Sequence, residues 1–232
     1  MPKRLRLFSV LLSAAVLCAA VPLSVRLWKI SAERAFTWED CGGAVCITAY
    51  SGTQAEWIIP ETLGGLPVVG IADRAFSGNE AVHTLRLPAA LREIGAYAFY
   101  ACPNLCDVQT QSSLQTVGDY AFSQCPLLTQ AEMDAETIGE GAFSGITALQ
   151  SVTLHHTQRI SEAAFADCPA LQTVTLPPTL QAVGKEAFYN DPMLQTVTVP
   201  KQTKLGKHAF GYRCGSHIVD SMPVEGFVLH RE

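Results

Sequence analysis

One segment recurs along most of this chain and limits the folds that the chain can adopt. Each copy ends in an Ala-Phe pair, and successive phenylalanines lie 23, 23, 21, 22, 23 and 22 residues apart. The seven phenylalanines are Phe76, Phe99, Phe122, Phe143, Phe165, Phe188 and Phe210. A repeat of this length predicts a solenoid, in which each copy forms one coil and stacks on its neighbours.

Within each copy, apolar residues lie at fixed distances from the phenylalanine. Leu171, Val174 and Leu176 follow Phe165 by six, nine and eleven residues, and the last two indicate a short strand with alternate side chains inward. Proline ends several of these strands, at residues 88, 177 and 200, because it has no N–H to donate. Glycine usually stands four residues before the phenylalanine, where we expect it to give the backbone freedom to turn back. These glycines are Gly95, Gly118, Gly139, Gly184 and Gly206.

The clearest copies share more than their apolar spacing. Residues 94–105 read IGAYAFYACPNL, and residues 160–177 follow the same pattern. Over roughly residues 57–210 the chain resembles the BspA-type leucine-rich repeat family, with its unit I-G-x-x-A-F-x-x-C-x-x-L-x-x-V-x-L-P. The resemblance implies a leucine-rich repeat solenoid of about seven coils of 21–23 residues, with short parallel strands on one face and few regular helices. It also implies a bacterial surface or secreted protein, because most family members are of this kind and some are adhesins that bind host proteins.

The first 25 residues predict export. Lys3, Arg4 and Arg6 precede the uncharged stretch Leu7–Val25. Two alternatives remain open for this segment: a signal peptide cleaved near Cys18-Ala19-Ala20, or an uncut membrane anchor that leaves the repeats outside the cell. In either case the segment is the only predicted contact with a membrane.

The rest of the chain divides around the repeats. Residues 26–36 form a connector, and residues 37–56 predict an N-terminal hairpin that caps the first coil. The repeats occupy residues 57–210. Beyond them the pattern decays, so residues 211–232 are interpreted as a degenerate C-terminal cap, with a last strand within residues 222–229.

The cysteines allow two kinds of role. Cys41 and Cys46 flank a Gly-Gly turn, and disulfides persist outside the cell, so this pair is the candidate disulfide. Cys102, Cys125 and Cys168 each follow a repeat phenylalanine by three residues, which indicates a column of small core residues. Cys102 and Cys125 lie on adjacent coils, so a bridge between them is the alternative.

Charge and missing motifs exclude several classes of function. Five of the 16 basic residues lie in residues 1–30, which hold no acid, so the other 202 residues carry 11 basic and 21 acidic side chains, a net charge of −10. Such a body does not suit nucleic acid. No phosphate-binding loop, nucleophile elbow or dinucleotide fingerprint occurs, and we predict no enzyme activity, cofactor or metal site. His155 and His156 are interpreted as an exposed pair, with Asp134 one coil earlier as the nearest companion.

The outward side chains of the repeat strands form the candidate partner-binding face. One residue from each strand represents this row: Arg86, Gln109, Glu132, Thr153, Thr175 and Thr198. The row holds charges and amides in its first half, hydroxyls in its second and no aromatic residue, which argues against sugar stacking. We predict a non-enzymatic cell-surface binding or adhesion module for an extracellular protein or glycan. The alternative is a structural envelope protein that organises surface components without a specific host ligand.

Overall fold

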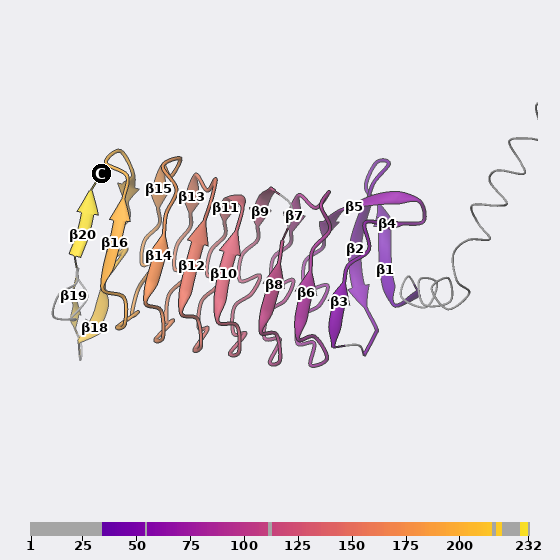
Figure 1. The fold of residues 1–232 in the computed structure, drawn as a ribbon, viewed down its shortest axis with the longest axis horizontal. Helices are drawn as coiled ribbons and strands as arrows, with labels where there is room; N and C mark the ends of the chain where they lie inside the picture. Colours follow the sequence, from indigo (N-terminus) through magenta and orange to yellow (C-terminus); the bar gives the residue numbers. More distant parts are fainter. Residues whose placement is uncertain (1–33, 54, 111–112, 215–216, 220–227, 232) are drawn as a thin grey trace, which may run out of the picture.

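The chain winds into a single row of stacked coils (Figure 1). The structure, a computed structural model, describes residues 34–53, 55–110, 113–214, 217–219 and 228–231. All the regular elements within these residues are strands. The described part holds no helix with the length and apolar character needed to cross a membrane, and Leu7–Val25 lies outside it.

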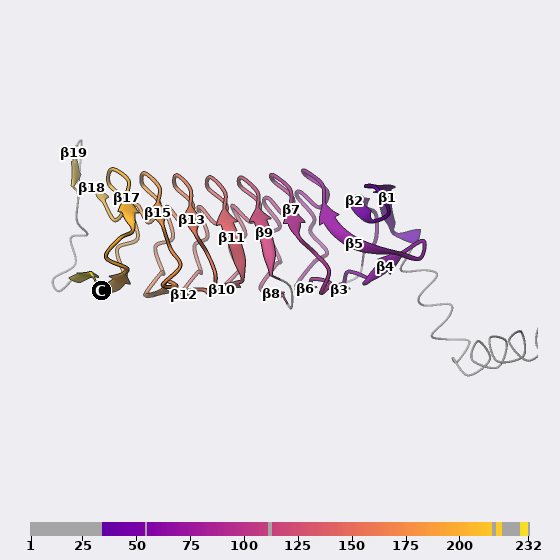
Figure 2. The ribbon, with the colours of Figure 1, turned by 90° about the horizontal axis from the view of Figure 1, so that it is seen from above.

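Parallel strands run along two sides of the solenoid, and the views in Figures 1 and 2 separate them. One side carries β3 (Glu56–Ile58), β6 (Thr84–Arg86), β8 (Asp107–Gln109), β10 (Gln130–Met133), β12 (Ser151–Leu154), β14 (Thr173–Thr175), β16 (Thr196–Val199) and β20 (Val228–Arg231). The other carries β1 (Phe36–Asp40), β2 (Val45–Tyr50), β4 (Thr62–Leu63), β5 (Leu66–Ile71), β7 (Glu93–Ile94), β9 (Leu114–Val117), β11 (Ala135–Ile138), β13 (Arg159–Ile160), β15 (Ala182–Val183) and β17 (Lys204–Leu205).

The predicted fold class is confirmed, and the structure adds a sheet on the second side of the solenoid. The predicted strands correspond to the first side, where β14, for example, pairs in parallel with β12 and β16. The segment that was expected only to turn the chain back forms the strands of the second side. In β7, Ile94 is buried and pairs with the buried Ile71 of β5.

The repeat phenylalanines form one continuous stack through the core. From Phe76 to Phe210, neighbouring rings lie 4.9–5.2 Å apart between centroids and within 12° of parallel. All seven rings are buried. Each ring packs against the rings of the neighbouring coils, as expected for a solenoid whose coils share a core.

The N-terminal hairpin covers the first coil, as predicted. Strands β1 and β2 pair antiparallel, and β2 pairs in parallel with β5. The rings of Phe36 and Tyr50 lie 6.5 and 5.9 Å from that of Phe76 and cover the end of the phenylalanine stack. A disulfide joins Cys41 and Cys46 across the turn, with their Cα atoms 6.1 Å apart.

The described C-terminal residues extend the solenoid. Strand β20 pairs in parallel with β16, so a last strand does add to the first side at residues 228–231, and residues 222–227 of the predicted segment lie outside the described residues. The guanidinium of Arg231 donates to the carbonyl of Thr203 at 2.9 Å. A two-stranded hairpin that was not predicted, β18 (Tyr212–Cys214) and β19 (His217–Val219), precedes it.

The prediction that the repeat glycines give the backbone freedom to turn back is wrong. None of them has a positive φ; the left-handed positions fall two residues before and after the phenylalanine, as at Tyr97 (φ 57°) and Ala101 (φ 53°). A Cβ added at Gly184 would lie 2.4 Å from the carbonyl carbon of Ser161 in the preceding coil. Close approach of the coils, and not backbone freedom, is therefore what favours glycine here, although Ala72 and Ser161 occupy the same column in two coils.

The cysteine column fills the core. Cys102, Cys125 and Cys168 are buried and carry free thiols, so the structure has no bridge between Cys102 and Cys125. The thiol of Cys125 donates to the carbonyl of Phe99 at 3.2 Å, and that of Cys102 donates to the carbonyl of Phe76 at 3.3 Å. Burial raises the pKa of the Cys168 thiol, so this group remains a protonated core side chain.

Candidate binding face

The outward side chains of the repeat strands are aligned in a row along one side of the solenoid, as the sequence predicts. We call it the strand face: the outward side chains of β3, β6, β8, β10, β12, β14 and β16. In β16, Thr196 and Thr198 are exposed while Val197 and Val199 are buried. The strand pairing aligns Arg86 with Gln109, and Glu132 with Thr153 and then Thr175. The six predicted residues therefore share one side of the molecule.

The strand face is interrupted between β8 and β10. Hydrogen bonding joins β3, β6 and β8 into one sheet and β10 to β20 into another, with no ladder between β8 and β10. The interruption lies beside the shortest repeat, the 21-residue interval between Phe122 and Phe143, where only Asp134 separates β10 from β11. Gln109 and Glu132 consequently face each other across a break and not across a continuous sheet.

A hollow of about 410 Å³ lies at this break. Its lining residues are Asp107, Val108, Gln109, Thr110, Gln130, Glu132, Asp134 and His155. A smaller hollow of about 160 Å³ adjoins it, lined by Glu56, Ile58, Thr84, Arg86, Asp107 and Gln109. Asp107 and Gln109 line both, so the two hollows are neighbours, and we call them together the depression, which extends from β3 to β12. Ile58, which is 51% exposed, gives this depression an apolar end.

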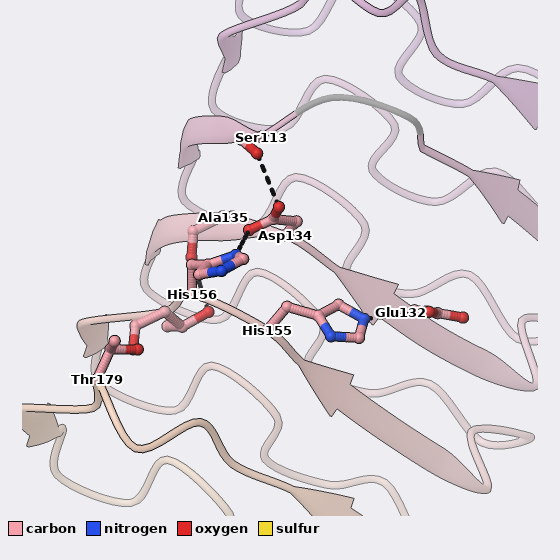
Figure 3. Close-up of polar contacts among 8 residues, drawn as sticks. Ser113, Glu132, Asp134, Ala135, His155, His156 and Thr179 are labelled. Atoms are coloured by element: carbon pink, nitrogen blue, oxygen red, sulfur yellow. Dashed lines mark hydrogen bonds and ion pairs between the residues drawn. The ribbon is translucent and has the colours of Figure 1, made fainter.

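Hydrogen bonds hold the polar side chains of the larger hollow in place (Figure 3). Glu132 accepts a hydrogen bond from Nε2 of His155 at 3.1 Å, and Asp134 contacts Nδ1 of His156 at 2.8 Å. The hydroxyl of Ser113 donates to the other oxygen of Asp134 at 2.7 Å. Partial burial of Asp134 opposes its ionisation, but the bonds from Ser113 and His156 outweigh this, so the pKa of Asp134 is lowered. The histidine pair is exposed, as predicted, although only His156 contacts Asp134.

An aromatic ridge outside the strand face was not predicted. Arg74 lies 4.6 Å above the ring of Tyr97, which in turn stacks on Tyr120 at 5.1 Å. The hydroxyl of Tyr120 donates to Glu140 at 2.8 Å, and this bond, with burial, raises the pKa of Tyr120 to about 12. All three ridge residues stand two positions before a repeat phenylalanine, so comparing that one column across the coils would have revealed the ridge.

The strand face carries side chains that suit noncovalent contacts. In the part of the chain that the structure describes, no three His, Cys, Asp or Glu side chains converge as metal ligands would. The strand face instead offers carboxylates, amides, one guanidinium and an exposed isoleucine on a row of rigid strands. These groups can bind a partner's polar and charged side chains without any reaction.

Comparisons with known proteins place the chain in a family. The model of the BspA type Leucine rich repeat region matches residues 66–157 and 130–219, with six copies. The two matches together cover more than half of the chain, and the protein belongs to this family. No curated protein matches the sequence.

Solved structures of similar fold are leucine-rich repeat proteins. The T. pallidum leucine-rich repeat protein TpLRR is 25% identical, with a TM-score of 0.52, and the match covers 69% of this chain and 87% of that one. A leucine-rich repeat protein of Bacteroides ovatus is 20% identical (TM-score 0.41; 85% and 66% covered). A leucine-rich cell surface protein of Faecalibacterium prausnitzii is 21% identical (TM-score 0.47; 76% and 72% covered). The likeness to TpLRR supports the solenoid fold.

Proposed function

We propose that this protein is a non-enzymatic binding module of a bacterial cell surface and that its strand face binds an extracellular protein. Three features support the location: the family, the basic leader before the uncharged stretch Leu7–Val25, and the Cys41–Cys46 disulfide, which suits an oxidising compartment. Whether the N-terminal segment is cleaved or retained does not change this proposal, because the repeats lie outside the cell in both cases.

The depression from β3 to β12 is the observation that carries the binding proposal. It brings Arg86 and the carboxylates of Glu132 and Asp107 onto one rigid surface, with Ile58 exposed beside them. Charges of both signs around an apolar contact suit a protein surface better than a sugar, which usually stacks on an aromatic ring. Beyond β12 the outward row of β14 and β16 holds only threonine hydroxyls, so the first half of the strand face is the proposed site.

Site-specific photo-crosslinking in the organism's own cells tests this proposal. A photoreactive amino acid replaces Gln109 in one strain and Thr198 in a matched strain, so that the same sheet side is probed inside and outside the depression. We expect a discrete protein adduct from position 109 and none from position 198. No adduct at position 109 would contradict the proposal and favour the structural alternative, in which the solenoid spaces surface components and its strand face recognises nothing.

A further inference from the structure

His155 lines the larger hollow and His156 a neighbouring one, and each contacts one carboxylate of the preceding coil (Figure 3). His155 meets Glu132 at 3.1 Å, and His156 meets Asp134 at 2.8 Å. The side chains of His155 and His156 are 45% and 73% exposed, so solvent protons reach both rings. Their carboxylate partners, Glu132 in β10 and Asp134 directly after it, both line the larger hollow. The net charge in this hollow therefore depends on whether the two imidazole rings are protonated.

Apart from the histidines, the charged side chains that line the larger hollow and the neighbouring hollow of His156 are all acidic, and Arg86 lines only the smaller hollow. Asp107 of β8 lines the same hollow as His155, and Glu136 lines a neighbouring hollow with His156. No lysine or arginine is among the described residues that line either of these two hollows, and Arg159, the next basic residue along the coil, lines neither. Thr153 pairs with Thr175 of the following coil. Continued along both chains, this register aligns His155 and His156 with the uncharged Pro177 and Pro178.

Protonation would therefore change the local charge substantially. Three carboxylates, Asp107, Glu132 and Asp134, line the same hollow as His155. An unperturbed histidine gains its proton near pH 6.5, while carboxylates stay ionised to about pH 4. Protonation of both rings would set two imidazolium ions against these three carboxylates. Each imidazolium already lies within hydrogen-bond distance of a carboxylate oxygen, so it competes for that oxygen with any cation from outside.

We propose that the larger hollow of the depression holds a cationic segment of the partner, one that presents lysine or arginine, at neutral pH and releases it in acid through His155 and His156. The proposal rests on the strand face being the binding site. It adds the chemistry of the partner, which follows from charge complementarity with three carboxylates, and a release condition, which follows from the two histidine–carboxylate contacts.

Binding of a fluorescent ten-residue oligolysine to the full chain at pH 7.5 and pH 5.0, at fixed ionic strength, tests the proposal. We expect wild type to bind about tenfold more weakly at pH 5.0, the effect of roughly two compensated surface charges. The double variant His155→Gln/His156→Gln should change less than about threefold. The matched control His83→Gln, which removes a histidine outside the depression, should keep the wild-type response.

The binding and crosslinking results together distinguish the pH switch, the cationic partner and the proposed function. Equal wild-type binding at both pH values, or an undiminished pH response in the double variant, overturns the switch. An oligolysine that fails to bind at pH 7.5, while position 109 still crosslinks to a protein, overturns the cationic partner and leaves the proposed function intact. Absence of both signals overturns the proposed function and the inference with it.

Discussion

At the scale of single residues, Asp191 is the least expected member of the core. It occupies the column that holds Cys102, Cys125 and Cys168 in other coils, and it is fully buried. One carboxyl oxygen accepts a hydrogen bond from the backbone N–H of Cys168 at 2.8 Å, and the other has no partner among the described residues. Burial raises its pKa well above the usual value, so the folded protein holds a proton that the unfolded chain releases.

Replacing this carboxyl should change how stability depends on pH. Because the folded-state pKa is raised, the contribution of Asp191 is most favourable below about pH 4 and is lost progressively as pH rises toward the folded-state pKa. The variant Asp191→Cys restores the residue that the column uses elsewhere. We expect it to gain stability over wild type between pH 5 and pH 8, as measured by denaturant unfolding at each pH. A stability difference that does not grow with pH would contradict a buried, protonated Asp191.

The repeat glycines offer a second test at this scale. Gly184→Ala brings a Cβ against the backbone of Ser161, which neither coil can move aside easily, so we expect a loss of roughly 1–3 kcal/mol in unfolding free energy. The control Ala163→Gly places glycine where the backbone is left-handed (φ 53°) and should be neutral or stabilising. Thermal or denaturant unfolding measures both. If Gly184→Ala were tolerated, close approach of the coils would not explain the glycine.

At the scale of the elements, the stacked rings are the main connection between coils. Phe165 is fully buried, with its ring centroid 5.2 Å from those of Phe143 and Phe188. Phe165→Ala should therefore cost roughly 3–5 kcal/mol in unfolding free energy, as other large core truncations do. Thr175→Ala, on the exposed strand face, is the control and should change stability little. An unchanged midpoint in Phe165→Ala would show that the register of the repeats is wrong.

The sequence was sufficient for the parts of these elements that repeat. The phenylalanine column and the alternation of β14 and β16 followed from the repeat spacing, and the β1–β2 hairpin followed from its Gly-Gly turn and the alternation beside it. The second sheet did not, because a strand of two residues such as Glu93–Ile94 is too short to show alternation. The break between β8 and β10 could not be predicted from the sequence either, since it depends on hydrogen bonding between coils and not on the pattern within one coil.

The candidate site was predictable in outline only. The strand face was found because outward positions follow directly from inward ones. The depression at the break and the partners of His155 and His156 depend on side chains from different coils, whose separation no single repeat reveals. The ridge of Arg74, Tyr97 and Tyr120 shows the converse, because its signal is present in the sequence but appears only when one column is compared across coils.

At the scale of the whole molecule, the disulfide connects the structure to a compartment. Trypsin releases residues 35–74 as one peptide that contains both Cys41 and Cys46. In protein purified without reductant from its own cells, we expect this peptide to gain two alkylation sites only after reduction. Mass spectrometry measures this directly. Full alkylation without reduction would contradict the disulfide and weaken the argument for an oxidising location.

The N-terminal segment decides how the solenoid is displayed. The intact mass of the protein from membrane and medium fractions distinguishes the two alternatives. A chain in the medium that is shorter by about 20 residues indicates a cleaved signal, and a full-length chain in the membrane fraction indicates an anchor. A full-length chain confined to the cytoplasm would contradict both, and with them the proposed surface location.

The measurement that tests the strand face most directly is the affinity of a double variant for the protein that crosslinks at position 109. Arg86→Ala/Glu132→Ala removes one charge of each sign from the depression, and Thr175→Ala/Thr198→Ala is the matched control on the same side of the solenoid. We expect the first variant to bind at least about tenfold more weakly at an unchanged Tm, and the control to bind as wild type does. Wild-type affinity in Arg86→Ala/Glu132→Ala would show that the first half of the strand face is not the binding site.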